Sequence, residues 1–238
     1  VWYEPCAETI AELPEKDFMR FSPWWEEHLR EVRETVRLSE GEFPVGIPDV
    51  QENIDILAAM RGAQNLCYDL MDEPETVKTV LSRLEGAADY CYDEMYRAVA
   101  LADGSSVFTA FAIWGSGRTA KVQCDFSAMI SPGAYREFVL PGLMRECARL
   151  DHSLYHLDGP GALVHADAVL SIPSLQALQW TSGAGQNDGG SEEWFPLYDK
   201  VMDAGKSLWI QIYEGEPYVW LERAKKIVRR YGTRGIYF

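Results

Sequence analysis

The stretch SLYHLDGPG, residues 153–161, decides how the rest of the chain is interpreted. An apolar run leads into a histidine and an aspartate two residues apart, and Gly-Pro-Gly then breaks the extended backbone. Side chains alternate between the two faces of a strand, so His156 and Asp158 are expected to share one face. If the strand ends there, both side chains face a cleft at its carboxyl end. In the structural alternative, His156 caps the strand and Asp158 caps the helix expected at 162–170.

Strand-like and helix-like segments alternate on both sides of this stretch. Strands are expected at residues 1–5, 43–47, 106–113, 175–180, 207–213 and 235–238. Helices are expected at 23–38, 53–60, 64–71, from 74 onward, 131–149, 162–170, 192–203 and 218–231. This alternation is typical of an α/β fold with a parallel sheet. We therefore predict one domain over residues 1–238, a (β/α)8 TIM barrel. The first and last segments read as inner strands that stop at the chain ends, so we expect an incomplete barrel, a fragment of a longer chain.

Composition and charge restrict the partners of the chain. It has 238 residues, 47% hydrophobic and 25% charged, as in ordinary globular proteins. The net charge of −15 argues against nucleic acid and anionic membranes, because phosphate binding needs a basic face. No apolar run reaches the roughly 18 residues of a membrane span. The five cysteines form no CxxC pair, which favours free thiols. We expect a cytoplasmic protein with a small-molecule substrate, and an oligomer is compatible with the sequence.

Polar and aromatic residues follow most of the predicted strands, where barrel enzymes place their reacting groups. The candidates are Glu4, Asp49, Trp114, Arg118, Gln123, Asp125, His156, Asp158, Trp180, Asp188, Gln211, Tyr213 and Glu214. Of these, we predict catalytic roles for Asp125, Gln211 and Glu214. We predict substrate contacts for Trp114, Arg118, Trp180 and Tyr213. Gln211 stands inside an apolar strand, where a buried amide needs a partner such as a ligand. The alternatives are a helix N-cap for Asp125 and a turn for Asp188.

The His-x-Asp spacing can also hold a metal. Zinc accepts an imidazole nitrogen and a carboxylate oxygen, so His156 and Asp158 are predicted metal ligands. A third ligand would come from Glu214, from Asp125 or from sequence outside the chain. Zinc is the candidate cofactor that this spacing suggests. The chain contains no HExxH, P-loop or GxSxG motif.

The stretch DFSAMISPGAYREFVLP, residues 125–141, resembles the uroporphyrinogen decarboxylase superfamily. That superfamily shows an acidic residue, a Ser-Pro helix start and a Phe-x-x-Pro end in this arrangement. The likeness continues through HLDG at 156–159, which is similar to the family's His-x-Cys-Gly segment after a barrel strand. It also includes residues 175–180 and, upstream, Arg61-Gly62 and residues 70–75. The resemblance covers most of residues 43–238 and implies a TIM barrel.

The superfamily contains two chemistries. One branch decarboxylates the acetate arms of uroporphyrinogen without a cofactor, using arginines and an aspartate near the start of the barrel. The other transfers methyl groups to or from a corrinoid or thiol, with zinc held by His-x-Cys and a later Cys. His156 matches the zinc-ligand position, Asp158 stands where that branch has cysteine, and the arginine-rich segment of the decarboxylases is not present. The resemblance thus favours methyl transfer with a corrinoid protein or thiol, and tetrapyrrole decarboxylation is the alternative.

Two further functions stay open. Eight tryptophans and carboxylates such as Glu4 and Glu214 would suit a TIM-barrel glycosidase, whose two carboxyl groups lie about 5–10 Å apart across a cleft. The last alternative is a barrel that binds a tetrapyrrole or another small molecule without catalysis.

Overall fold

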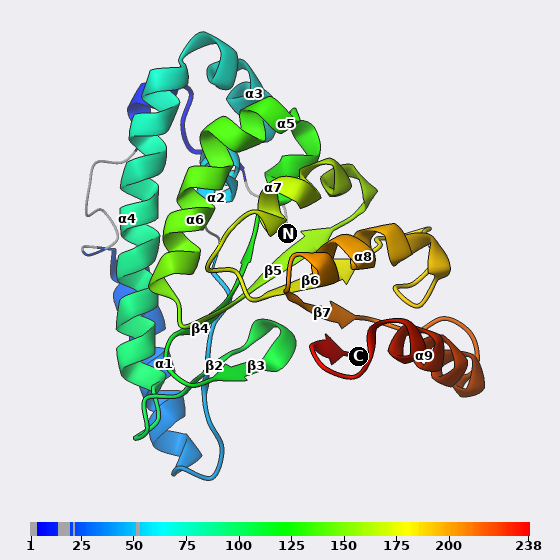
Figure 1. Cartoon of the computed structure of the whole chain (residues 1–238). Helices are drawn as coiled ribbons and strands as arrows, with labels where there is room; N and C mark the ends of the chain where they lie inside the picture. Colours follow the sequence, from blue (N-terminus) through cyan, green and yellow to red (C-terminus); the bar gives the residue numbers. More distant parts are fainter. Residues whose placement is uncertain (1–3, 14–19, 21, 51–52) are drawn as a thin grey trace.

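A five-stranded parallel sheet forms the centre of the protein (Figure 1). The computed structural model describes residues 4–13, 20, 22–50 and 53–238. The strands follow chain order: β4 (Thr119–Gln123), β5 (His152–Asp158), β6 (Ala177–Thr181), β7 (Ser207–Ile210) and β8 (Ile236–Tyr237). A smaller sheet joins β1 (Gly46–Ile47), β2 (Ser106–Phe108) and β3 (Ile113–Gly115), with β1 parallel and β3 antiparallel to β2. The predicted α/β class is confirmed. A closed barrel is not seen in the described part of the chain, which forms two separate sheets.

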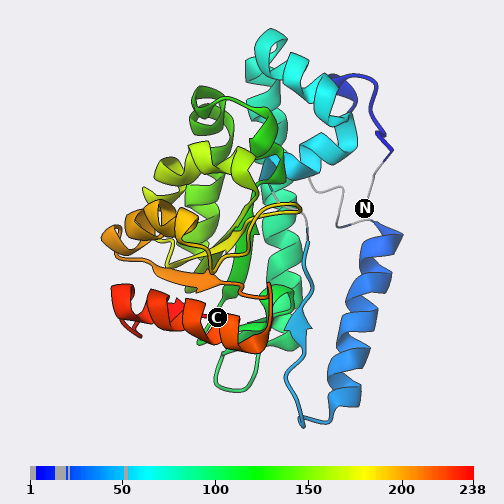
Figure 2. The same cartoon turned by 90° about the vertical axis from the view of Figure 1, so that its right-hand side faces the viewer.

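Helices connect the parallel strands and lie mainly on one side of the central sheet (Figure 1). They are α1 (Pro23–Ser39), α2 (Asn53–Arg61), α3 (Ala63–Asp72), α4 (Pro74–Val99), α5 (Pro132–Ala134), α6 (Leu140–Arg149), α7 (Ala166–Leu170), α8 (Phe195–Asp203) and α9 (Pro217–Tyr231). Short 3₁₀ turns are found at Ile10–Glu12, Ala110–Ala112, Asp125–Met129, Pro160–His165 and Glu192–Trp194. The expected helices at 23–38, 53–60, 64–71, 192–203 and 218–231 are confirmed within a few residues. Figure 2 shows α1 at the edge of the molecule away from α8 and α9.

The helix predicted at 131–149 begins as expected but is not continuous. The Ser131 hydroxyl accepts a hydrogen bond from the Ala134 amide, as an N-cap does. A π-turn at Tyr135–Val139 then separates α5 from α6. Pro141, at the start of α6, has no backbone N–H to donate to the preceding turn, which explains why the regular ladder is interrupted there.

The register of the parallel strands divides their side chains between two faces. The helix-facing side chains are buried: Tyr155, Leu157, Leu178, Trp180, Leu208 and Ile210. The other face carries the residues paired with His156, namely Gln123 on β4 and Gln179 on β6. The β2–β3 hairpin lies on this second side (Figure 1), where the Phe111 ring contacts His156 and Trp209. We call this second side the inner face.

The strand predicted at 106–113 is confirmed only over Ser106–Phe108, because the chain then reverses at Phe111 and Ala112. Phe111 and Ala112 have φ angles of 63° and 48°, left-handed values that are rare for residues other than glycine. The reversal sends β3 antiparallel to β2, with Ser106 opposite Gly115. Residues 114–118 are therefore carried to the amino-terminal edge of β4, away from the carboxyl edge where the sequence placed them.

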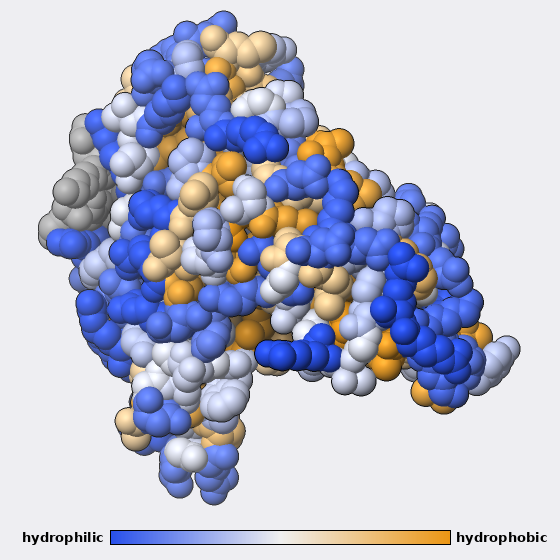
Figure 3. Space-filling view, in the orientation of Figure 1, coloured by the Kyte–Doolittle hydropathy of each residue, from blue (hydrophilic) through white to orange (hydrophobic). Residues whose placement is uncertain are grey.

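The remaining sequence expectations concern the ends, the thiols and the outer surface. Of the strand predicted at 1–5, residues 1–3 lie outside the described residues, and Glu4 and Pro5 are in no strand. All five cysteines are free. Within the described ranges, no helix is long and apolar enough to cross a membrane. Figure 3 shows hydrophilic residues over most of one face, in line with the high charge.

Candidate functional site

Five residues, one from each parallel strand, form a row across the inner face. Gln123 pairs with His156, His156 with Gln179, Gln179 with Trp209, and Trp209 with Tyr237. Gln123 ends β4, and His156 and Gln179 stand two residues before the ends of β5 and β6. The row thus lies at or near the carboxyl ends of the strands, the edge at which parallel α/β sheets bind ligands. Two amides, one imidazole and two aromatic rings are brought together by strand register alone.

His156, the second member of this row, is half-buried. Its Nδ1 makes a short hydrogen bond to Oε1 of Gln179, which is 0% exposed. The amide Nε2 of Gln179 donates to the Trp180 carbonyl at 2.8 Å and to Thr181 Oγ1 at 2.9 Å. The Phe111 ring lies with its centroid 5.0 Å from the imidazole. His156 is therefore held by an amide and a ring, while its other nitrogen has no partner in the described part of the chain.

A buried lysine supports the neighbouring end of the row. Lys121, on the inner face of β4, is only 1% exposed. Its Nζ donates to Gln123 Oε1 at 2.8 Å and pairs with Asp49 Oδ1, just beyond β1, at 2.9 Å. Gln123 in turn donates to Asp125 Oδ2 at 3.2 Å. A buried ammonium needs such partners, and they link β1, β4 and the exposed Asp125 at the carboxyl edge.

Asp55, on α2, binds the backbone that follows β4 at the same carboxyl edge. Its carboxylate is buried and accepts hydrogen bonds from the backbone N–H of Asp125 at 2.8 Å and of Phe126 at 2.9 Å. Burial raises the pKa of Asp55 from its usual 3.8 to about 6, although the two backbone donors act in the opposite direction. Asp55 is thus the group that fixes the backbone leading out of β4.

Replacing Asp55 by asparagine is expected to change how stability depends on pH. The folded pKa of Asp55, about 6, lies above the unfolded value, so its stabilising contribution is complete below about pH 3.8. That contribution is lost as pH rises through about 6. Between pH 4 and 7 the wild type should lose about 2–3 kcal/mol of unfolding free energy relative to Asp55→Asn. Urea unfolding at both pH values measures the difference, and parallel pH profiles for the two proteins would contradict it.

An apolar cavity of about 350 Å³ lies on the inner face, on the amino-terminal side of the row, where Leu154, Ala177 and Ser207 line it. Its aromatic lining consists of Phe111, Trp114, Trp209 and Tyr237, and smaller residues of β3, β5, β6, β7 and β8 complete it. Phe111 and Trp209 are in edge-to-face contact with centroids 4.9 Å apart. An aromatic cavity of this size beside a few polar groups is typical of small-molecule sites. Trp114, predicted to contact substrate, lines this cavity from β3.

The other predicted residues at the carboxyl ends have different surroundings. Strand β7 ends at Ile210, so Gln211 is exposed beyond the strand, and the prediction of a buried amide there is wrong. The backbone N–H groups of Tyr213 and Glu214 donate to the buried Asp188. The Glu214 carboxylate lies 3.4 Å from Arg223. Asp188 forms a turn as the alternative interpretation expected, since its carboxylate accepts from the Gly190 N–H at 2.9 Å, and it also joins the loops after β6 and β7.

Two predicted substrate contacts lie away from the row. Trp180 is 0% exposed, points to the helices and packs on Trp194 with centroids 5.0 Å apart. It is a core residue because Gln179, its neighbour, takes the inner face. Arg118 precedes β4 at the amino-terminal edge and pairs with Asp93 of α4. The predicted cleft positions of Trp180 and Arg118 are therefore wrong.

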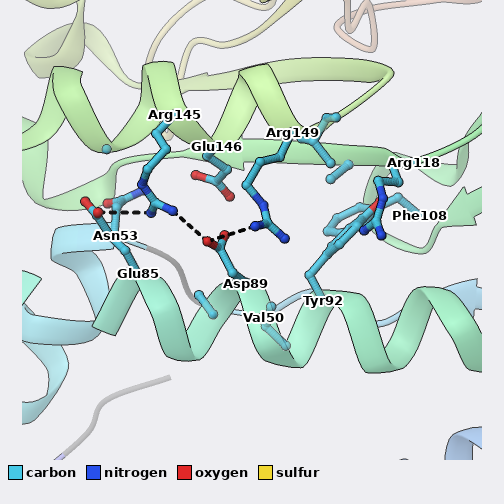
Figure 4. Close-up of a pocket in the computed structure, with 14 residues that line it drawn as sticks. Val50, Asn53, Glu85, Asp89, Tyr92, Phe108, Arg118, Arg145, Glu146 and Arg149 are labelled. Atoms are coloured by element: carbon cyan, nitrogen blue, oxygen red, sulfur yellow. Dashed lines mark hydrogen bonds and ion pairs between the residues drawn. The ribbon is translucent and has the colours of Figure 1, made fainter. Parts of the chain in front are cut away.

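Arg118 lines a second hollow, between α4 and α6 (Figure 4). Arg145 pairs with Glu85 at 2.9 Å and with Asp89 at 2.6 Å, and Arg149 pairs with Asp89 at 3.3 Å. The hollow has a volume of about 40 Å³, far below that of a substrate site. Its charges therefore join two helices. A third hollow, of about 430 Å³, lies between α1, α2 and α4 and is almost wholly apolar.

The metal prediction lacks a third ligand. In residues 4–13, 20, 22–50 and 53–238, no group of three or more His, Cys, Asp and Glu side chains is placed to hold a metal ion. Nδ1 of His156 is engaged by Gln179, and Asp158 is exposed at the end of β5. The described residues therefore do not fit a resident zinc ion, and no step of the chemistry is assigned to one.

Comparisons with known proteins support the fold. No family model matches the sequence, and no curated protein sequence is similar to it. Among solved structures, a methyltransferase from Methanosarcina mazei is similar, with a TM-score of 0.50 and 11% identity. The match covers 85% of this chain and 64% of that one, so this chain spans less than two thirds of the length of its neighbour. A likeness at this identity shows a shared fold, and membership of the uroporphyrinogen decarboxylase superfamily stays a prediction.

Proposed function

We propose that the chain takes part in enzymatic methyl transfer to or from a small molecule bound at His156, in the row that also contains Gln123 and Gln179. The observation that carries the proposal is this row, which places one half-exposed imidazole and two amides near the carboxyl ends of three neighbouring strands. The fold shared with a methyltransferase and the HLDG resemblance at 156–159 support the same reaction class. The donor or acceptor that we propose is a corrinoid, with a thiol as its counterpart.

The row suits the thiol, which is the smaller of the two proposed reactants. His156 offers a nitrogen that can accept a proton, and the aromatic cavity, which is lined by the same Phe111 that contacts His156, can hold an apolar body. Phe111 packs against the imidazole and reduces the access of water to one side of it. A group bound there would be oriented by neutral hydrogen bonds rather than by fixed charges.

Decarboxylation of a tetrapyrrole is less well supported. A substrate with several carboxylates needs cations at its binding site. Arg118, the cation expected there, lies at the opposite edge and pairs with Asp93. Lys121 pairs with Asp49, and Arg223 pairs with Asp188. These charges are already matched within the protein.

Parallel assays of the wild-type protein distinguish the two reactions. Methylcobalamin and 2-mercaptoethanol are incubated with the protein, and formation of the methyl thioether is followed by mass spectrometry. Uroporphyrinogen is incubated separately and its loss of carbon dioxide is measured. We expect thioether formation above the protein-free rate and no decarboxylation. Decarboxylation without methyl transfer would contradict the proposal, and so would the absence of any change in both assays.

A further inference from the structure

The orientation of the Gln179 side chain is determined by its surroundings. Its Nε2 donates to the Trp180 carbonyl at 2.8 Å and to Thr181 Oγ1 at 2.9 Å. A flipped amide would place its oxygen against the Trp180 carbonyl, and two acceptors cannot share a hydrogen bond. The hydrogen-bond network therefore assigns Oε1 to the side that faces His156. Because Gln179 is fully buried, water does not offer an alternative partner.

This orientation determines which nitrogen of His156 carries hydrogen. The Gln179 Oε1 can only accept, so its partner Nδ1 has to donate. In a neutral imidazole with hydrogen on Nδ1, Nε2 has a free lone pair. Nε2 has no hydrogen-bond partner among the described residues, and His156 is half-exposed. The inner face therefore presents an acceptor at this point.

We propose that Gln179 is a positioning residue that holds His156 as the Nδ1–H tautomer, so that the site takes a ligand with a hydrogen to donate. Suitable groups are a thiol, a hydroxyl or an N–H. In methyl transfer, which rests on the function proposed above, the acceptor gives its proton to Nε2. A lone pair of the acceptor atom forms the new bond to the methyl carbon. The bond from the methyl group to the donor breaks, and its electron pair stays on the donor. A methyl acceptor that already carries a negative charge has no proton to give to Nε2, so His156 does not assist its reaction.

Nitrogen NMR of the ¹⁵N-histidine-labelled protein tests the tautomer without any assay of activity. In the wild type with neutral His156, we expect the ring to show a protonated Nδ1 and an unprotonated Nε2. In Gln179→Leu the hydrogen bond is lost, and the ratio of Nδ1–H to Nε2–H should fall by roughly threefold to tenfold. Gln179→Glu, buried as the neutral acid, keeps one oxygen as acceptor for Nδ1 and an O–H that can replace Nε2 as donor to the Trp180 carbonyl, so it should retain the wild-type tautomer.

A matched control uses a second glutamine near the same strands. Gln176 accepts from the Ser153 backbone at 2.6 Å, at the other end of β5, so Gln176→Leu should leave the His156 signals unchanged. An Nε2–H tautomer in the wild type would overturn the proposal, and so would an unchanged ratio in a folded Gln179→Leu protein. If methyl transfer is absent while the NMR result holds, the function proposed above fails and the tautomer assignment stands.

Kinetics then tests whether the tautomer of His156 determines the rate of methyl transfer. With 2-mercaptoethanol as acceptor, Gln179→Leu should lower kcat by about threefold to tenfold with a smaller change in KM, because the acceptor still binds while a smaller fraction of His156 has Nε2 free to take its proton. Gln179→Glu should recover most of the rate. Equal losses in Gln179→Leu and Gln179→Glu would show that Gln179 contributes only to packing, against the proposal.

Discussion

Replacing Asp188 by alanine is expected to lower the free energy of unfolding by about 3–5 kcal/mol. The carboxylate is 0% exposed and pairs with Arg223 of α9. It also accepts hydrogen bonds from the backbone N–H groups of Gly190 at 2.9 Å, Tyr213 at 2.7 Å and Glu214 at 2.8 Å. Alanine leaves three donors and a guanidinium without this partner, which is the costly way to break a buried pair. Urea unfolding of the variant and the wild type measures the loss.

Glu192→Ala is the matched control for this prediction. Glu192 also pairs with α9, through Lys226, but both side chains are more than half exposed. Exposed pairs contribute about 0–1 kcal/mol, so this variant should unfold close to the wild type. If Asp188→Ala and Glu192→Ala had equal effects, Asp188 would not be the joint between the loops after β6 and β7.

Most of the fold could be predicted because its signals are local. The helix α1 has its serine cap and its proline in adjacent positions, and α4 shows its buried stripe at helical spacing. The strand β5 was predicted from an apolar run that ends at Asp158. His156 was placed correctly near the carboxyl end of that strand. Such elements need no information from distant parts of the chain.

The register of β6 could not be predicted in the same way. Gln179 and Trp180 are adjacent, and a shift by one residue exchanges the face of every side chain. The sequence favoured Trp180 as the ligand contact, whereas pairing with β5 sends Gln179 to the inner face. Lys121 was missed because it stands in an apolar strand, and its partner Asp49 comes from a distant segment. A charged residue alternating with apolar ones is the signal that could have revealed Lys121.

The β2–β3 hairpin was missed because its turn lacks the usual residues. Tight reversals commonly use glycine, asparagine or proline, yet here Phe111 and Ala112 take the left-handed conformation. Two such residues in succession cost about 1–2 kcal/mol each. The contacts of Phe111 with His156 and Trp209 help to offset that cost. Tertiary packing therefore decides this turn, and with it the positions of Trp114 and Arg118.

His156→Ala is expected to lower kcat for methyl transfer by about 10²- to 10⁴-fold, the usual contribution of a side chain that accepts or donates a proton. The physical reason is that Nε2 of His156 is the acceptor that the inner face offers to a bound thiol. The fold should persist, because the His156 ring is half-exposed and its contacts are one hydrogen bond and the Phe111 ring. Circular dichroism and urea unfolding check this.

The ratio of the methyl-transfer rates of His156→Ala and His152→Ala tests the account most directly. His152 lies on the same strand at its amino end, where it contacts Ser116 at 3.1 Å, and it has no place in the row. With methylcobalamin and 2-mercaptoethanol, the account predicts that His152→Ala stays within about twofold of the wild type, while His156→Ala loses at least about 100-fold. Equal rates in the two variants would contradict the claim that the carboxyl half of β5 carries the chemistry.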